Sequence, residues 1–144
     1  MALSEKKASI QAASLPRIRG IPPQIYQLFT NLISNSIKFC DGVPEIRTHS
    51  RDLEPRDLIQ YPQINKDLRY VEPHFTDNGI GFENQYTDQI FIIFHRLHNP
   101  QVYSGSGIGL TRCKKIVENH QASITAESTP GVGTTFRVIL PRFG

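Results

Sequence analysis

The sequence predicts an α+β fold, a two-layer α/β sandwich in which a mixed sheet is covered on one face by helices. Two segments have the apolar spacing of amphipathic helices, 22–40 and 109–120. Short segments of alternating or β-branched apolar residues surround them, at 43–53, 69–77, 122–129 and 134–141. An amphipathic helix buries its apolar stripe against another element, and here the sheet is the available partner.

Length and composition fit one globular domain over residues 1–144. Of the 144 residues, 38% are hydrophobic. No apolar run reaches the ~20 residues that a membrane helix requires, and residues 1–14 lack the apolar core of a signal peptide. Cys40 and Cys113 form no metal-like or redox-like pair. These features predict a cytoplasmic protein, with membrane contact only through a parent protein.

The net charge of +3 and the pI of about 9.0 do not predict a nucleic-acid partner. The basic residues form no run, and only the pairs at 6–7 and 114–115 are adjacent lysines. An anionic small ligand explains the charge equally well.

The elements are justified in chain order. Residues 8–20 contain a short alternating piece that predicts an edge strand, and the helix at 22–40 opens with proline, a favoured first-turn residue. Ile21 stands where a capping side chain is usual, so we expect the start of this helix to fray. Residues 54–67 are polar and proline-rich, which predicts a long surface loop with one helical turn. Pro73 inside the strand at 69–77 predicts an edge strand or a bulge.

The second half of the chain closes the domain. Residues 83–98 are predicted to be helical, or half helix and half lid. The helix at 109–120 places its apolar residues on one face, namely Leu110, Cys113, Ile116 and Val117. The turn "PGVG" at 130–133 joins the last two strands into a hairpin.

The first helix carries a polar stripe about 60° wide, made of Gln24, Gln27, Asn31, Asn35 and Lys38. A solvated helix face is the simplest interpretation. Asparagine is a mediocre helix former, however, whereas solvated faces favour Glu and Lys. Two asparagines one turn apart indicate a placed feature. An amide oxygen can bind Mg²⁺ beside substrate phosphates, and Lys38 can pair with a phosphate.

The stretch "DNGIGF" at 77–82 follows a strand. It is either a turn or a base-recognition site. In the second interpretation, a buried Asp77 carboxylate accepts a hydrogen bond from the exocyclic amine of adenine and rejects guanine. Gly79 and Gly81 would then let the backbone approach a flat base.

The stretch "GSGIGL" at 105–110 runs into the start of a helix. It is neither a dinucleotide fingerprint nor a P-loop. Backbone N–H groups at a helix N-terminus form an anion site, and bare glycines let a loop fold over phosphates. A flexible linker is the alternative. Just before it, "FIIFHRLH" supplies Arg96, a cation that can reach a terminal phosphate, while Phe91, Phe94 and Leu97 are expected to pack.

The order of these motifs closely resembles the ATP-binding catalytic domain of bacterial sensor histidine kinases. The resemblance runs from about Leu15 to Pro141 and includes "LPRIRG", "NLISNSIKF", "DNGIGF", "IFHRLH", "IVENH" and "TTFRVILP". It implies the Bergerat sandwich, which gyrase-type and heat-shock-type ATPases share, with ATP and Mg²⁺ as cofactors.

The resemblance also implies residue roles. Asn35 would bind Mg²⁺, Asn31 and Lys38 would face the phosphates with Arg96, and Phe39 would lie near the adenosine. Asp77 would bind the adenine amine beside Gly79 and Gly81, and Thr134 would support the base through water. The remaining group would form the hinge of an ATP lid and the helix start behind it: Gly105, Gly107, Gly109 and Leu110.

Two departures from the family pattern concern single residues. Ser36 stands where alanine is usual, which we expect to be without consequence. Gln121 replaces a glycine and is expected to adopt a left-handed backbone conformation.

The phosphoacceptor is missing from this stretch of sequence. The family carries it upstream on a helical dimerisation hairpin, whereas the first histidine here is His49, beyond the asparagine helix. We therefore expect a catalytic domain whose acceptor lies on a separate dimerisation domain of the parent kinase, with a response regulator as an indirect partner.

Three functions remain open at this point. The first is a histidine kinase catalytic domain, which would not phosphorylate itself without the acceptor domain. The second is a nucleotide-binding module without transfer activity. The third is a gyrase-type or heat-shock-type ATPase, which requires a carboxylate base one turn before Asn35, where this chain has Asn31.

Overall fold

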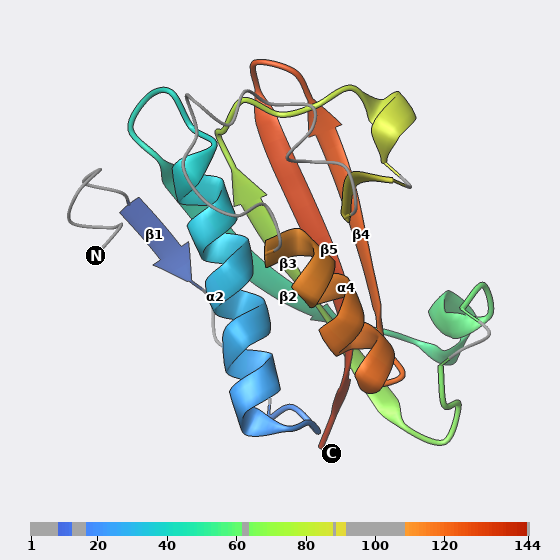
Figure 1. The fold of residues 1–144 in the computed structure, drawn as a ribbon. Helices are drawn as coiled ribbons and strands as arrows, with labels where there is room; N and C mark the ends of the chain where they lie inside the picture. The colour runs from blue at the N-terminus through green and yellow to red at the C-terminus, as the bar shows by residue number, and fades with distance from the viewer. Residues whose placement is uncertain (1–8, 13–16, 62–63, 88, 92–108, 144) are drawn as a thin grey trace.

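The computed structural model describes residues 9–12, 17–61, 64–87, 89–91 and 109–143. Its sheet contains five strands in the order β1-β2-β3-β5-β4 (Figure 1). β1 pairs in parallel with β2, and the other neighbours are antiparallel. The strands are β1 (Ser9–Ala12), β2 (Glu45–Asp52), β3 (Arg69–Asp77), β4 (Ser123–Thr129) and β5 (Gly133–Arg142). The predicted mixed sheet, with its first strand at the edge and its closing hairpin, is confirmed.

Two helices, α2 (Pro22–Lys38) and α4 (Gly109–Asn119), lie side by side on one face of the sheet (Figure 1). Leu28 and Leu32 of α2 are fully buried. They join the four apolar residues predicted for α4 and the inner side chains of β5 in one core. The predicted two-layer sandwich, with helices on one face, is therefore confirmed. In the segment predicted as helical or half lid, η2 spans Asn84–Tyr86, and residues beyond 91 lie outside the described part before α4 begins.

The opposite face of the sheet carries a smaller core. Tyr70 and Ile139 point away from the helices, because side chains alternate along a strand and Phe75 and Val138 belong to the main core. Leu58, at the end of the 3-10 helix η1 (Pro55–Leu58), and Ile64 pack against them. The predicted single helical turn is confirmed, and the loop around it also covers one end of the sheet.

Pro73 lies in a central strand, so the prediction of an edge strand was wrong. β3 pairs with β2 on one side and β5 on the other. Val71 pairs with Leu140 and His74 with Arg137, so the register is the same on both sides of the proline and no residue is inserted. The predicted bulge is therefore also wrong. The ladder with β5 is interrupted at 72–73, which accommodates the missing N–H of proline without a change of register.

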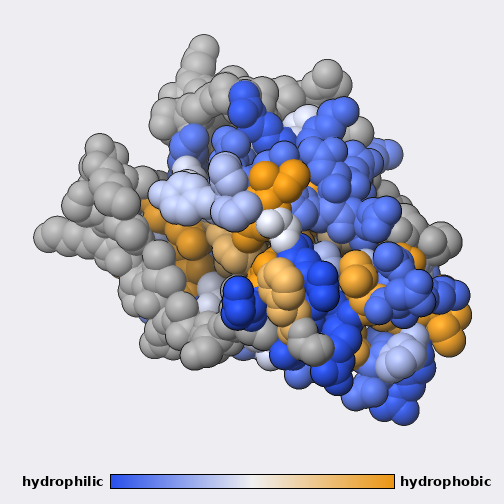
Figure 2. Space-filling view, turned by 90° about the horizontal axis from the view of Figure 1, so that it is seen from below, coloured by the Kyte–Doolittle hydropathy of each residue, from blue (hydrophilic) through white to orange (hydrophobic). Residues whose placement is uncertain are grey.

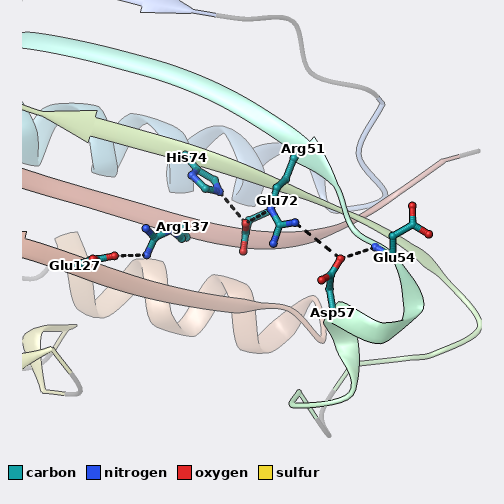
Figure 3. A network of polar contacts seen from close by, with 7 residues as sticks. All are labelled: Arg51, Glu54, Asp57, Glu72, His74, Glu127 and Arg137. Atoms are coloured by element: carbon teal, nitrogen blue, oxygen red, sulfur yellow. Dashed lines mark hydrogen bonds and ion pairs between the residues drawn. The ribbon is translucent and has the colours of Figure 1, made fainter.

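A polar network on the outer face ties β2, β3 and η1 together (Figure 3). The buried Glu72 carboxylate accepts hydrogen bonds from Arg51 Nε at 2.9 Å and His74 Nε2 at 2.7 Å. Burial alone would raise the pKa of Glu72, but the hydrogen bonds from His74 and Arg51 outweigh it and hold that pKa below its ordinary value. Arg51 also approaches Asp57, whose carboxylate accepts the backbone N–H of Glu54 at 2.8 Å. The network thus fastens the loop to the sheet.

Hydrophobic side chains also reach the surface. Viewed from below, they form separate patches among hydrophilic residues (Figure 2). Phe143 is partly shielded, because the guanidinium groups of Arg17 and Arg19 lie 5.2 and 4.7 Å from its ring centroid. Single exposed apolar residues are ordinary on folded proteins. In the described part of the chain the large ones are Ile21, Tyr26, Val43, Ile59, Val132 and Phe143.

The start of α2 is closed by a residue from the end of α4. Ile21, the N-cap residue, has no side-chain cap, as the sequence predicts. Its backbone N–H instead donates to His120 Nε2 at 2.9 Å, and the other ring nitrogen, Nδ1, lies 2.8 Å from the Ile116 carbonyl. Nδ1 therefore carries the hydrogen and Nε2 is the acceptor. Gln121 follows with a φ of 52°, which confirms the expected left-handed conformation.

Replacing His120 by alanine removes this closure. We expect His120→Ala to lower the free energy of unfolding by about 1 kcal/mol, the typical effect of losing a helix cap. Urea unfolding measures the loss, and amide exchange should quicken in the first turn of α2. Lys115→Ala, at an exposed position of α4, is the control. Equal stability of the two variants would contradict the capping role.

The Cys113 thiol is expected to be inert in the folded protein. Burial raises its pKa to about 12, so the reactive thiolate is absent near pH 8. In a Cys40→Ala variant, alkylation at pH 8 should be negligible without denaturant and complete in concentrated urea. Rapid modification of the native variant would show that Cys113 is accessible.

Candidate functional site

Asp77, the last residue of β3, lies where three other elements meet. Its Oδ1 accepts the backbone N–H of Gly79 at 2.9 Å and that of Thr134 at 3.1 Å. Its Oδ2 accepts the hydroxyl hydrogen of Ser36 on α2 at 2.7 Å. The residue is only 9% exposed. The structure therefore joins the loop after β3, the start of β5 and the C-terminal half of α2 at one carboxylate.

Burial and hydrogen bonding have opposite effects on the pKa of Asp77. Burial raises the pKa of the carboxyl group, because the charged form loses its hydration. The hydrogen bonds from Ser36, Gly79 and Thr134 favour the ionised form and oppose this effect, although the pKa remains above its ordinary value. The result is a hydrogen-bond acceptor held in a poorly hydrated position.

The loop after Asp77 is packed against other backbone, and its glycines are needed for that reason. A Cβ atom on Gly79 would lie 2.6 Å from the Phe39 carbonyl oxygen. One on Gly81, which has a φ of +68°, would clash with the Thr129 carbonyl. In the observed arrangement Ile80 N–H donates to the Phe39 carbonyl at 2.8 Å. Sequence reasoning explained these glycines by a bound base; the structure gives a second reason, which lies within the protein.

Ser128 on β4 is the centre of a buried hydroxyl network. It accepts the N–H of Phe82 at 2.9 Å and donates its hydrogen to the Gly133 carbonyl at 2.7 Å. Thr134 Oγ1 lies 2.9 Å from Ser128 Oγ. Since the only hydroxyl hydrogen of Ser128 is already used, Thr134 must be the donor in this pair. The hydroxyl oxygen of Thr134 keeps the capacity to accept a hydrogen bond.

The polar stripe of α2 meets the start of α4. Asn31 Nδ2 donates to the Gly109 carbonyl at 3.4 Å, and at the far end Asn119 Nδ2 donates to Gln24 Oε1 at 3.3 Å. Among the described residues, a Cβ atom on Gly109 would meet the Asn31 side chain alone, at 4.0 Å. The side chain of Leu110 is buried in the core. Only the backbone of Leu110 can therefore meet a ligand.

The remaining predicted residues divide into two groups. Asn35, Lys38 and Phe39 lie at the C-terminal end of α2, each partly buried, and Phe39 packs against the core. Arg96, Gly105 and Gly107 lie outside the described residues, so their predicted roles have no structural account.

Sequence reasoning missed three residues that hold the site together. Ser36 was expected to be without consequence, yet it bonds the Asp77 carboxylate. Ser128 carries the hydroxyl network. Asn78 joins its loop to the start of β2, by accepting the Glu45 N–H at 2.8 Å, and to the segment before it, by donating to the Val43 carbonyl at 3.0 Å. The sequence could have predicted a role for Ser36, because it falls one turn after Leu32 on the buried side of α2. A buried hydroxyl group requires a hydrogen-bond partner.

Two kinds of feature are absent from the described residues. They contain no group of three or more His, Cys, Asp or Glu side chains that could hold a metal ion. None of their helices combines the length and apolar character needed to cross a membrane.

The sequence of this chain is similar to those of known proteins. The profile of the family described as histidine kinase-, DNA gyrase B- and HSP90-like ATPase matches residues 20–143. The phytochrome-like protein Cph1 of Synechocystis sp. (strain ATCC 27184 / PCC 6803 / Kazusa) is 38% identical over 140 residues, which are 96% of this chain and 17% of Cph1. The chain thus spans a small part of the length of such relatives.

Solved structures share the fold. The mycobacterial sensor histidine kinase MprB has a TM-score of 0.74 at 19% identity, covering 96% of this chain and 85% of that one. Full-length ShkA in complex with AMPPNP has a TM-score of 0.72 at 18% identity, covering 99% of this chain and 28% of that one. With the family profile over most of its length and sensor histidine kinases among its relatives, the chain belongs to the histidine kinase-, DNA gyrase B- and HSP90-like ATPase family.

Proposed function

We propose that this chain binds ATP with Mg²⁺ and transfers the γ-phosphate to a histidine on a separate dimerisation domain of a sensor kinase. The observation that carries the proposal is the buried Asp77 carboxylate, held by donors from α2, β5 and its own loop. Family membership supports ATP as the ligand. The phosphohistidine would then supply a response regulator.

Asp77 is suited to recognise adenine. A carboxylate has about four acceptor positions, and three donors use three of them. The remaining position on Oδ2 can accept the exocyclic amine of adenine. Guanine presents a carbonyl oxygen at that place, so two acceptors would face each other. Thr134 can in turn accept a hydrogen bond from a water beside the base.

The phosphates are assigned to the other end of the site. Asn31 contacts the first residue of α4 directly, and Lys38 lies two turns further along the polar stripe of the same helix. α4 is an 11-residue helix whose N-terminal N–H groups favour an anion. Arg96 and the glycines at 105 and 107 would complete this side.

The donor set suits Mg²⁺ better than a metal held by protein alone. The described residues offer no carboxylate or histidine cluster, whereas Mg²⁺ usually takes few protein ligands together with phosphates and water. The amide oxygen of Asn35 would be the protein ligand. Bound Mg²⁺ would supply neutralisation of the charge on the phosphates.

The transfer needs little covalent chemistry from this chain. A neutral imidazole nitrogen of the acceptor attacks the γ-phosphorus with its lone pair. The bond from the γ-phosphorus to the bridging oxygen breaks, and ADP leaves with that electron pair. The chain contributes positioning and charge neutralisation through Lys38 and Arg96. Asn31 disfavours a gyrase-type or heat-shock-type hydrolysis, because its amide cannot act as the required carboxylate base.

Asp77→Asn tests the adenine assignment. The amide oxygen can replace Oδ1, while the NH₂ group faces Ser36, whose hydroxyl can turn to accept. The NH₂ group would then oppose the adenine amine, and we expect ATP binding to weaken by ~1–3 kcal/mol. Calorimetry with ATP and GTP measures the effect. Equal affinity for the two nucleotides in the unmutated chain would refute adenine recognition.

The same variant separates binding from folding. Because the pKa of Asp77 is raised in the folded protein, ionisation of Asp77 lowers stability as the pH rises through that pKa. An uncharged Asn avoids this loss, so at pH 7 Asp77→Asn should unfold at the same urea concentration or a higher one. Asp67→Asn, an exposed residue of the loop before β3, is the control for both measurements.

Phosphotransfer is tested with γ-labelled ATP and a purified dimerisation hairpin. The chain alone should form no phosphohistidine on its five histidines. In the described part, both ring nitrogens of His120 have partners, and His74 Nε2 is bonded to Glu72. With the hairpin, we expect an acid-labile, alkali-stable label that disappears when the acceptor histidine is replaced. Nucleotide binding without such a label would identify a binding module, and release of inorganic phosphate alone would identify an ATPase.

A further inference from the structure

The contact between Ser36 and Asp77 has features that a merely tolerated serine would lack. Ser36 is 3% exposed and lies on the side of α2 that faces the sheet. A serine inside a helix commonly bonds the carbonyl one turn earlier in its own helix. Here its hydroxyl crosses to Oδ2 of Asp77 at 2.7 Å, a length typical of a donor to a charged oxygen.

The three donors to Asp77 differ in kind and in the carboxylate oxygen that they bond. Gly79 and Thr134 both bond Oδ1 through backbone N–H groups, which every residue except proline would keep. Ser36 supplies the side-chain donor to Oδ2. The carboxylate is planar, so rotation about its bond to Cβ moves Oδ2 together with Oδ1, and a donor to Oδ2 restrains the same rotation as the two donors to Oδ1. The Ser36 hydroxyl limits this rotation.

We propose that Ser36 is a positioning residue that aims the remaining lone pair of Asp77 Oδ2 at the ligand and so strengthens selection for an exocyclic amine. The inference rests on the proposed function, because it assigns to Ser36 the specificity of the same nucleotide site. Ser36 itself touches Asp77 and acts through it.

The decisive measurement is the dissociation constant of purine riboside triphosphate divided by that of ATP, a ratio that is high when the protein prefers the amine. ATP and purine riboside triphosphate differ only by the exocyclic amine, so the ratio of their dissociation constants reports the amine contact. In Ser36→Ala we expect this ratio to fall about three- to tenfold, the loss of one net hydrogen bond. Alanine is the best helix former, so α2 should remain intact. Ser36→Thr keeps a hydroxyl and should restore most of the ratio.

Two controls distinguish positioning from a general structural effect. Ser34→Ala changes a serine of the same helix on another side and should leave the ratio unchanged. In an Asp77→Asn background the amine contact is already lost, so adding Ser36→Ala should change the ratio no further. A structural defect would instead weaken both nucleotides equally in every background.

The outcomes separate this inference from the proposed function. If the unmutated chain binds ATP with an amine preference and Ser36→Ala keeps that preference in full, the role of Ser36 is refuted and the nucleotide site remains. If Ser36→Ala lowers the ratio as much in the Asp77→Asn background as it does when Asp77 is intact, the path through the carboxylate is refuted. If the unmutated chain binds neither nucleotide, the proposed function fails, and the role of Ser36 fails with it.

Discussion

The close approach of three backbone segments around residues 77–82 is the constraint on which the rest of the site depends. Gly79 lies against the carbonyl of Phe39, and Gly81 against that of Thr129. Gly133 lies against the carbonyl of Asp77, where any side chain would clash. Because nothing larger than hydrogen fits at these contacts, the end of α2, the loop after β3 and the β4–β5 hairpin enclose the Asp77 carboxylate. Its low hydration and its three donors follow from that enclosure.

The fold could be predicted largely from the spacing of apolar residues, because helices and strands each repeat them with a characteristic period. The apolar stripe of 109–120 and the alternation of the closing hairpin are local properties of the chain, and both elements formed as expected. Pro73 misled the prediction for a physical reason. Proline removes one N–H group, which excludes one ladder hydrogen bond and leaves the rest of the strand free to pair. Sequence alone does not show that the ladder with β5 is open at that place.

The site was only partly predictable, because several of its residues take their meaning from distant partners. Asp77 and Asn31 stand in motifs that can be recognised locally. Ser36 is separated from Asp77 by 41 positions and His120 from Ile21 by 99, and no periodicity connects such pairs. Ile21 shows the consequence, since the sequence correctly predicts a missing side-chain cap, yet the expected fraying ignores the histidine that replaces it.

The bonds between α2 and α4 have a mechanical consequence. Asn31 holds the first residue of α4, while Asn119 and His120 at its end hold Gln24 and the residue before α2. The two helices are therefore bonded to each other near both ends, so a tilt of one against the other would break at least one of these hydrogen bonds. The position of Gly109, where α4 begins, is thus set by a contact from α2 as well as by the packing of Leu110 in the core.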